Sequence, residues 1–281
     1  MASLKTELSF WLKKYNVKPN KDLGQCFLVA ENALNKIVAA ARIKPGDRVL
    51  EIGGGTGVLT NKLLAGGAEV LVVEKDSRLA LVLHERFDQE RRIGRLKIIQ
   101  ADFLALPFPE TLERQGFQNG EYKVVANLPY QITSPAIERV LERNFLPSLA
   151  VLTIQKEVAE RICAPAGDLS SLAVLVQACA QKCTLAAKFL PGCFYPQPEV
   201  DSALLTLENI TYPTGVDIKT LRQVIRAGFA QKRKKLKTNL QNVFGKTPVE
   251  KIWVKLDLPE NIRAQELPVT QWIALTAALS A

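Results

Sequence analysis

The stretch Arg48-Val49-Leu50-Glu51-Ile52-Gly53-Gly54-Gly55-Thr56-Gly57 decides the fold of this chain. Its apolar first half predicts a short buried strand, and residues 58–64 after the glycines predict a helix. A strand that passes through a glycine turn into a helix brings backbone N–H groups close to a bound ligand. Glycine is needed there because a Cβ would block the tight turn and the close approach. The stretch therefore predicts an α/β sheet with a ligand at the turn, although an ordinary glycine-rich turn explains the turn alone almost equally well.

The spacing of the glycines narrows the class of ligand. Gly53, Gly55 and Gly57 form a G-x-G-x-G pattern, whereas dinucleotide-binding turns have G-x-G-x-x-G. The chain has no Gly-Lys-Ser/Thr sequence at this turn, which excludes a phosphate loop of the Walker type.

Composition sets further limits on function. With 281 residues, of which 47% are hydrophobic, the chain can bury a full α/β core and carry a smaller second domain. The net charge of +9 indicates a polyanionic partner, nucleic acid more than membrane, although excess charge also serves solubility. One histidine, His84, excludes a His-rich metal site and disfavours a Ser-His-Asp triad. We therefore expect no bound metal.

The sequence also indicates where the protein resides. Its five cysteines include no C-x-x-C pair and are interpreted as small buried side chains in a reducing compartment. No apolar run is long enough to span a membrane, and Lys5 and Glu7 interrupt any signal-peptide core. We expect a cytoplasmic protein that has no membrane partner.

Two acidic residues follow predicted strands. Glu74 comes after a strand predicted over residues 69–73, and Asp102 after one over residues 96–99. Ligands of doubly wound sheets sit beyond the carboxyl ends of the strands. An acid about 20 residues after the glycine turn suits two ribose hydroxyls. Each acid alone could be a helix cap or a solvated side chain, but their shared placement favours ligand contact.

The tetrapeptide Asn127-Leu128-Pro129-Tyr130 follows a strand predicted over residues 122–126. Pro129 lacks an N–H and holds Leu128 extended, which leaves main-chain carbonyls around the proline able to accept hydrogen bonds. Asn127 adds a side-chain carbonyl, and Tyr130 adds a flat face. Together they predict a pocket for a planar group with an exocyclic amine, whereas the tetrapeptide alone would also fit a simple turn.

The N-terminal segment has two possible roles, and the C-terminal part of the chain is predicted to be helical and basic. Leu23-Gly24-Gln25-Cys26-Phe27-Leu28 either caps the core or forms a lid strand over the ligand. The last two strands are predicted over residues 182–189 and 203–207 as an antiparallel pair. Helices are predicted over residues 217–229, 232–243, 248–256 and 269–279. No acid occurs between Asp217 and Glu250, so this basic run favours phosphate contact over a merely solvated face.

With these motifs the chain resembles the ribosomal RNA adenine dimethylase family of S-adenosylmethionine-dependent methyltransferases, and is most similar to its small-subunit members. The resemblance covers nearly the whole chain. Its motifs are Leu23–Leu28, Glu51–Gly57, Glu74, Asp102, Asn127–Tyr130, Gln155-Lys156-Glu157-Val158-Ala159 and Phe194-x-Pro196-x-Pro198-x-Val200-Asp201-Ser202. The family usually has Asn where this chain has Cys26, which can contribute only its backbone or a weak thiol.

The resemblance implies a fold and a domain organisation. It implies an α/β Rossmann-like sheet of the class I S-adenosylmethionine-dependent methyltransferase type, with a small all-α domain at the C-terminus. We expect the catalytic domain over residues 1–208, including a basic lid over residues 1–30, and a helical RNA-binding domain over residues 209–281.

The resemblance also implies roles for individual residues. Gly53 and Gly55 would lie against the methionine part of the cofactor, Glu74 on its ribose and Asp102 on its adenine amine. The full implied cofactor set is Gln25, Cys26, Leu28, Gly53, Gly55, Gly57, Glu74, Asp102 and Asn127. The implied catalytic set is Asn127, Leu128, Pro129, Tyr130 and Phe194. The predicted RNA-binding set is Arg222, Arg226, Lys232, Arg233, Lys234, Lys235 and Lys237.

The chemistry of the implied reaction agrees with these residue types. The N6 nitrogen of adenine is a poor nucleophile because its lone pair is delocalised into the ring. If Asn127 and a main-chain carbonyl accept the two N6 hydrogens, the nitrogen moves toward tetrahedral geometry and its lone pair becomes available. Alignment and preorganised dipoles then supply most of the catalysis. The target base would stack on Tyr130 and on Phe194, for which a role as a core anchor is an equal alternative.

We therefore expect an enzyme that dimethylates N6 of two adjacent adenosines near the 3′ end of small-subunit rRNA. Its partner would be the rRNA of an immature small ribosomal subunit, and we expect a monomer. One alternative is a large-subunit rRNA methylase of the antibiotic-resistance type. Another is a non-catalytic assembly or transcription factor on the same fold, against which the intact Asn127–Tyr130 motif argues.

Overall fold

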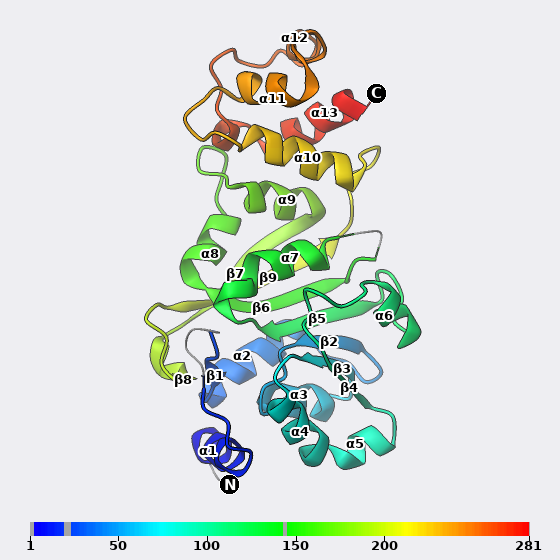
Figure 1. Cartoon of the computed structure of the whole chain (residues 1–281), viewed down its shortest axis with the longest axis vertical. Coiled ribbons are helices and arrows are strands. Elements are labelled where there is room, and N and C mark those ends of the chain that lie inside the picture. Colours follow the sequence, from blue (N-terminus) through cyan, green and yellow to red (C-terminus); the bar gives the residue numbers. More distant parts are fainter. Residues whose placement is uncertain (1–2, 20–23, 143–144, 281) are drawn as a thin grey trace.

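The centre of the molecule is a seven-stranded sheet with the strand order β4-β3-β2-β5-β6-β9-β7 (Figure 1). The computed structural model describes residues 3–19, 24–142 and 145–280. The strands are β2 (Arg48–Ile52), β3 (Glu69–Glu74), β4 (Leu96–Gln100), β5 (Tyr122–Asn127), β6 (Leu149–Gln155), β7 (Ala180–Phe189) and β9 (Ser202–Ile210). β9 runs antiparallel to both of its neighbours, and the other pairs are parallel. The predicted antiparallel pairing of the last two strands is confirmed.

Helices cover both faces of the sheet because its strands are apolar on both sides. Val49 of β2 belongs to the core under α2 (Glu31–Ala41), α3 (Val58–Ala65) and α4 (Ser77–Arg86). Its neighbours Leu50 and Ile52 belong to the core of the opposite face. That face carries α6 (Glu110–Arg114), α7 (Thr133–Val140), α8 (Lys156–Ile162) and α9 (Ser171–Cys179), and the short α5 (Asp88–Arg92) follows α4. The alternation follows from the two-residue period of a strand.

The N-terminal segment lies against the sheet domain at one end of the long axis. Helix α1 (Leu4–Lys14) is followed by the two-residue strand β1 (Phe27–Leu28), which pairs antiparallel with β8 (Phe194–Tyr195). Of the predicted lid over residues 1–30, residues 1–2 and 20–23 lie outside the described residues, and so does Leu23 of the Leu23–Leu28 segment. Short 3₁₀ helices are η1 (Tyr130–Ile132), η2 (Pro191–Cys193) and η3 (Ala264–Glu266).

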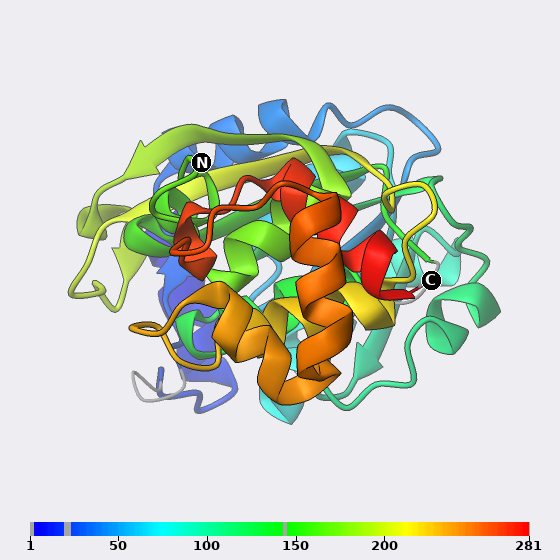
Figure 2. The same ribbon diagram turned by 90° about the horizontal axis from the view of Figure 1, so that it is seen from above.

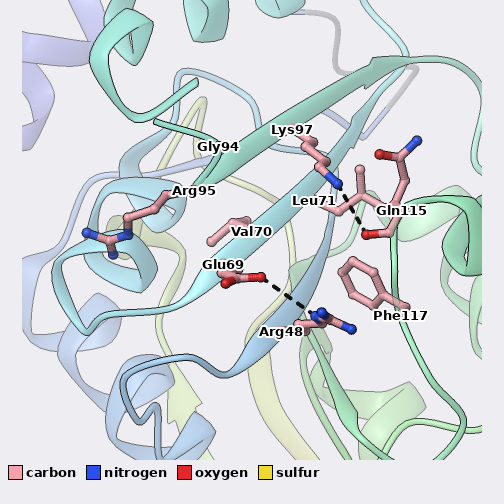
Figure 3. Close-up of a pocket in the computed structure, with 9 residues that line it drawn as sticks. All are labelled: Arg48, Glu69, Val70, Leu71, Gly94, Arg95, Lys97, Gln115 and Phe117. Atoms are coloured by element: carbon pink, nitrogen blue, oxygen red, sulfur yellow. Dashed lines mark hydrogen bonds and ion pairs between the residues drawn. The ribbon is translucent and has the colours of Figure 1, made fainter. Parts of the chain in front are cut away.

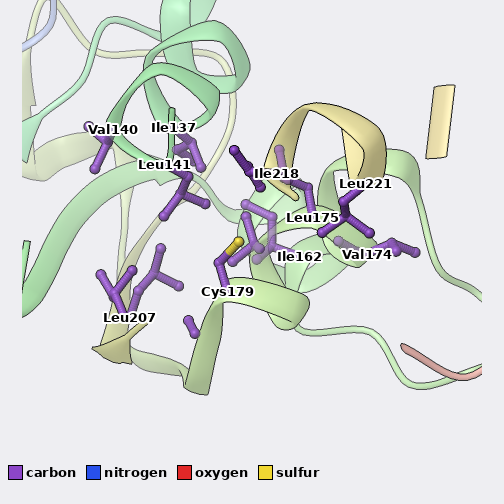
Figure 4. Packing of buried hydrophobic residues seen from close by; sticks show 14 of the residues in the cluster. Ile137, Val140, Leu141, Ile162, Val174, Leu175, Cys179, Leu207, Ile218 and Leu221 are labelled. Carbon is purple, nitrogen blue, oxygen red and sulfur yellow. The ribbon is translucent and has the colours of Figure 1, made fainter. Parts of the chain in front are cut away.

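The C-terminal helices lie at the other end of the long axis (Figure 1), and Figure 2 views the molecule from that end. They are α10 (Ile218–Gly228), α11 (Leu236–Phe244), α12 (Lys246–Lys255) and α13 (Val269–Ser280). Ile218 and Leu221 of α10 lie beside Val174 and Leu175 of α9 in one buried cluster (Figure 4). That cluster continues into the sheet core. The boundary after residue 208 stays a prediction, since β9 runs on to Ile210 and the core is continuous.

One predicted helix start was wrong. The helix predicted from residue 232 begins at Leu236, and residues 232–235 form a turn. The buried amide of Asn239 explains the turn, because its Nδ2 donates to the carbonyls of Gly228 (2.7 Å) and Gln231 (3.1 Å). No helix in the described ranges is long and apolar enough to cross a membrane.

Candidate active site

The predicted site residues gather where the strand order reverses. β2 pairs with β3 on one side and with β5 on the other, all in parallel. The glycine turn after β2, Glu74 at the end of β3 and Asn127 at the end of β5 therefore lie at one edge of the sheet. Doubly wound sheets bind ligands at this reversal point.

The glycines of the turn differ in the space beside them. Gly53 has a φ of 76°, and the nearest atom to a Cβ built there is Pro129 Cδ at 4.0 Å, so there is room beside it. Gly57 differs, because a Cβ there would come within 2.4 Å of the Phe87 ring. Packing against Phe87 and Leu83 therefore requires glycine at this position, and the cofactor contact expected of Gly57 stays a prediction.

The Glu74 carboxylate is fixed by backbone donors. Its Oε2 accepts from the N–H of Gly55 and its Oε1 from the N–H of Asp76, both at 2.9 Å. The residue is only 6% exposed, and burial raises the pKa of its carboxyl. A carboxylate has about four lone-pair positions, so two remain for hydroxyl donors. The geometry thus fits the two ribose hydroxyls expected at this position.

A second carboxyl lies buried beneath the turn and was not predicted as a site residue. Glu51 is 1% exposed, and the Thr60 hydroxyl donates to its Oε2 at 2.7 Å. Burial raises the pKa of Glu51 to about 8, and the nearby Glu74 carboxylate adds to the rise. The family motif that begins at Glu51 was its only sequence signal.

Asp102 follows β4 and is held from two sides. Its Oδ1 accepts from the N–H of Leu104 at 2.9 Å, and its Oδ2 pairs with Lys75 Nζ at 2.8 Å. This hydrogen bond to Lys75 lowers the pKa of the Asp102 carboxyl. Asp102 is therefore charged near neutral pH, and its carboxylate can accept a hydrogen bond from an adenine amine. The pairing with Lys75 was not predicted.

The side-chain amide of Asn127 is oriented by the backbone of the predicted lid. Its Nδ2 donates to the carbonyl of Cys26 at 2.9 Å. This bond identifies the nitrogen, and so directs Oδ1 away from Cys26 as an acceptor. The carbonyl oxygen of Pro129 already accepts a hydrogen bond from the N–H of Ile132 at 3.1 Å. Leu128 O accepts no backbone hydrogen bond from the part of the chain that the structure describes. Asn127 Oδ1 and Leu128 O are thus the two acceptors suited to an exocyclic amine.

Tyr130 is anchored at its hydroxyl. The phenol oxygen and Ser202 Oγ at the start of β9 are 2.7 Å apart. The ring is half-buried, and burial raises the pKa of the phenol. Its position is therefore fixed before any ligand arrives. Ser202 belongs to a quoted motif but was not predicted to touch Tyr130.

Phe194 lies in the core. It is 2% exposed and faces Leu28 in the short β1–β8 pair. This placement agrees with the alternative of a core anchor. Its neighbour Tyr195 is 43% exposed.

The predicted lid covers the glycine turn. The Phe27 ring lies 3.3 Å from the position that a Cβ of Gly55 would occupy. Gly24 lies against Tyr130 and Gln131, where any side chain would collide with the Gln131 amide. Gln25 and Cys26 between them are half-buried. The segment thus lies between the glycine turn and the Asn127–Tyr130 turn, as the lid alternative predicts.

The predicted RNA-binding residues divide into two groups. Arg222 is used within the chain, because its guanidinium contacts the carbonyl and the carboxylate of Glu138. Lys237 is also used, pairing with Glu260 at 2.7 Å. The remaining residues are exposed and have no ion pair among the described residues, namely Arg226, Lys232, Arg233, Lys234 and Lys235. Gln231 and residues 232–234 line a hollow in the turn before α11.

A small pocket lies at the opposite edge of the sheet from the glycine turn and Asn127 (Figure 3). It is lined by Arg48, Glu69, Val70, Leu71, Gly94, Arg95, Lys97, Gln115 and Phe117, at the ends where the strands begin. None of them is a predicted site residue. Within the described residues, no group of three or more His, Cys, Asp or Glu side chains is arranged to hold a metal ion.

Comparison with known proteins shows the family to which this chain belongs. The family model for ribosomal RNA adenine dimethylase matches residues 16–280. A ribosomal RNA small subunit methyltransferase A from Dehalococcoides mccartyi is 36% identical over 274 residues, covering 96% of this chain and 91% of the relative. A dimethyladenosine transferase from Plasmodium falciparum has a TM-score of 0.73 at 28% identity, covering 89% of this chain and 95% of that one. The 23S rRNA methyltransferase ErmE has a TM-score of 0.65 at 24% identity, covering 91% of this chain and 100% of that one, which shows the fold alone.

Proposed function

The chain belongs to the ribosomal RNA adenine dimethylase family, and from this premise we propose that it dimethylates N6 of two adjacent adenosines near the 3′ end of small-subunit rRNA, with S-adenosylmethionine as the methyl donor. The oriented amide of Asn127 is the observation that carries the proposal. The protein acts on the immature small subunit, as a monomer in the cytoplasm, with its catalytic domain over residues 1–208 and its helical domain over residues 209–281.

The residues around the glycine turn suit the proposed methyl donor. Glu74 retains lone pairs for the two ribose hydroxyls, Asp102 is charged opposite an adenine amine, and Gly53 leaves room for the methionine part. When bound, S-adenosylmethionine supplies a methyl group activated by a positively charged sulfur.

The chain's own residues hold and activate the target adenine. Asn127 Oδ1 and Leu128 O accept the two hydrogens of the N6 amine, which frees the nitrogen lone pair. The ring of Tyr130, anchored by Ser202, supplies the face on which the base stacks. The lid excludes water from the turn through Phe27. Because the acceptors are already oriented, they do not reorganise during the reaction.

Two measurements test the proposal. First, the wild-type enzyme and S-adenosylmethionine are added to small-subunit particles from a strain that lacks this enzyme, and methylated adenines are mapped by primer extension. Two adjacent dimethylated adenines near the 3′ end are expected. Large-subunit RNA is treated in parallel, and modification there in place of the small-subunit RNA would support the large-subunit alternative.

Second, Asn127→Ala tests the mechanism. We expect the activation free energy of methyl transfer to rise by about 3 kcal/mol, by analogy with losing one oxyanion-hole group. The single-turnover rate at saturating cofactor and RNA should then fall on the order of a hundredfold. RNA affinity and folding are expected to survive. Asn35→Ala, at an exposed position on α2, is the matched control. A wild-type rate for Asn127→Ala would refute this mechanism.

A further inference from the structure

Helix α1 presents aromatic rings and positive charge together on its solvent side. Phe10 is 57% exposed, and its ring packs edge-on against Trp11 with 5.1 Å between centroids. Lys14 Nζ lies 5.6–6.0 Å from the ring centroids of Phe10, Trp11 and Tyr15. Lys13 lies on the same side as Phe10, three positions along the helix. We call Phe10, Trp11, Lys13 and Lys14 the α1 outer face.

The other side of α1 is fixed to the domain. Leu8 and Leu12 pack with Leu79 of α4, and the lid residue Phe27 packs against this cluster. Polar contacts reinforce the docking, since Glu7 pairs with Arg86 and Lys14 with Glu85. The α1 outer face is therefore a rigid platform beside the lid, and its rings need little reordering to bind a ligand.

The charge of this platform indicates its partner. The only acid from residue 3 to 19 is Glu7, which Arg86 neutralises, and the one acid paired with the α1 outer face among the described residues is Glu85, the partner of Lys14. Lys5, Lys13 and Lys18 are exposed and form no ion pair with any described residue. Rings that offer faces for bases, beside lysines that neutralise phosphates, are the combination that binds single-stranded nucleic acid.

We propose that the α1 outer face binds a single-stranded stretch of the RNA substrate, with a base stacked on Phe10 and a phosphate neutralised by Lys13. The inference rests on the proposed function, because it extends the binding surface of the same substrate. α1 and the exposed basic residues before α11 lie at opposite ends of the long axis (Figure 1). RNA held at both places spans the molecule and passes the Asn127–Tyr130 turn between them.

The test uses the full-length double variant Phe10→Ala/Lys13→Gln. Stacking on one ring and one phosphate contact predict that RNA affinity falls at least fivefold. The slope of log affinity against log salt should fall by about 0.7. In methyl transfer, KM for RNA should rise by a similar factor while kcat stays within twofold. Cofactor affinity and melting temperature should not change, since Phe10 contacts only Trp11 and Lys14 among the rings and charges described.

The matched control is Ile93→Ala/Lys44→Gln. It also removes one exposed apolar side chain and one exposed lysine, but at the edge where the strands begin. The proposal is overturned if the Phe10→Ala/Lys13→Gln variant matches this control in affinity and salt slope. It is equally overturned if the loss of affinity occurs with particles and not with protein-free RNA, because that would assign the face to a ribosomal protein. Methyl transfer by the wild-type enzyme is measured in the same experiment. If the wild type transfers no methyl group to the RNA, the proposed function fails, whatever the variant does to RNA affinity.

Discussion

Glu74 links the third strand to the glycine turn, and its replacement tests the cofactor site directly. We expect Glu74→Ala to weaken S-adenosylmethionine binding at least tenfold, because the carboxylate that accepts hydrogen bonds from two hydroxyls is removed. Glu74→Gln should weaken binding less, since it keeps one acceptor. Glu31→Ala is the control, because Glu31 is an exposed acid whose ion-pair partner on the described surface is Lys62. Calorimetry gives the affinities, and equal values for wild type and Glu74→Ala would remove this residue from the site.

Glu51 makes stability depend on pH. Its folded pKa of about 8 lies above its ordinary value because the carboxyl is buried, so the folded state holds a proton that the unfolded state releases. The resulting stabilisation is full below the unfolded pKa and is lost as pH rises through 8. Glu51→Gln keeps the neutral form, so its unfolding free energy relative to wild type should increase by roughly 1.4 kcal/mol per pH unit between pH 5 and 8. Urea unfolding at several pH values measures this, and a difference that is constant with pH would contradict it.

Cys26 shows what could not be predicted from the sequence at the scale of one residue. The resemblance marked the departure from Asn, but the structure shows that Cys26 contributes its backbone carbonyl to Asn127. That contribution is independent of the side chain. We therefore expect Cys26→Ser and Cys26→Asn to retain cofactor affinity and turnover within about twofold, measured by calorimetry and methyl transfer. A large decrease in both variants would mean that the thiol makes an essential contact.

Among the elements, the turn before α11 carries the basic run. Replacing Lys232, Arg233, Lys234 and Lys235 by Ala should weaken RNA binding and reduce its salt slope by up to roughly 0.9 for each phosphate that is no longer neutralised. Cofactor affinity should not change. The double variant Lys36→Ala/Lys44→Ala removes exposed charge elsewhere and serves as the control. If the salt slope stays at the wild-type value, the run is only a solvated face.

Most elements could be predicted because their signals are local. The apolar residues of β2 and of β3 marked their elements at the right place. The start of α11 could not be predicted, because the turn at residues 232–235 depends on Asn239 reaching back to Gly228. In the site, too, residues with a local sequence signal could be predicted and contacts between distant segments could not. Glu74, Asp102 and Asn127 are marked by strand ends, whereas the Lys75–Asp102 and Tyr130–Ser202 contacts join segments that sequence spacing does not relate.

At the scale of the whole molecule, the catalytic sheet and the C-terminal helices share one buried cluster. Leu221 of α10 is fully buried in it. Leu221→Ala should lower the unfolding free energy by about 2–5 kcal/mol. It should also shift the unfolding of the sheet and of the helices together, because neither has a separate core. In a Trp11→Phe background, fluorescence of Trp253 and Trp272 reports on the helices, and far-ultraviolet dichroism reports on the whole chain. Two separated transitions would contradict a shared core.

The pairing of β1 with β8 joins two strands that the ribosome synthesises at very different times. Leu28 is paired with Phe194, so the lid's partner strand is synthesised long after the lid itself. At roughly 5–20 residues per second, the delay is on the order of ten seconds or more. During that time the lid has only its contacts with Asn127 and with the cluster of Leu8, Leu12 and Leu79. The pairing of Leu28 with Phe194 is therefore the last contact of the lid that can form.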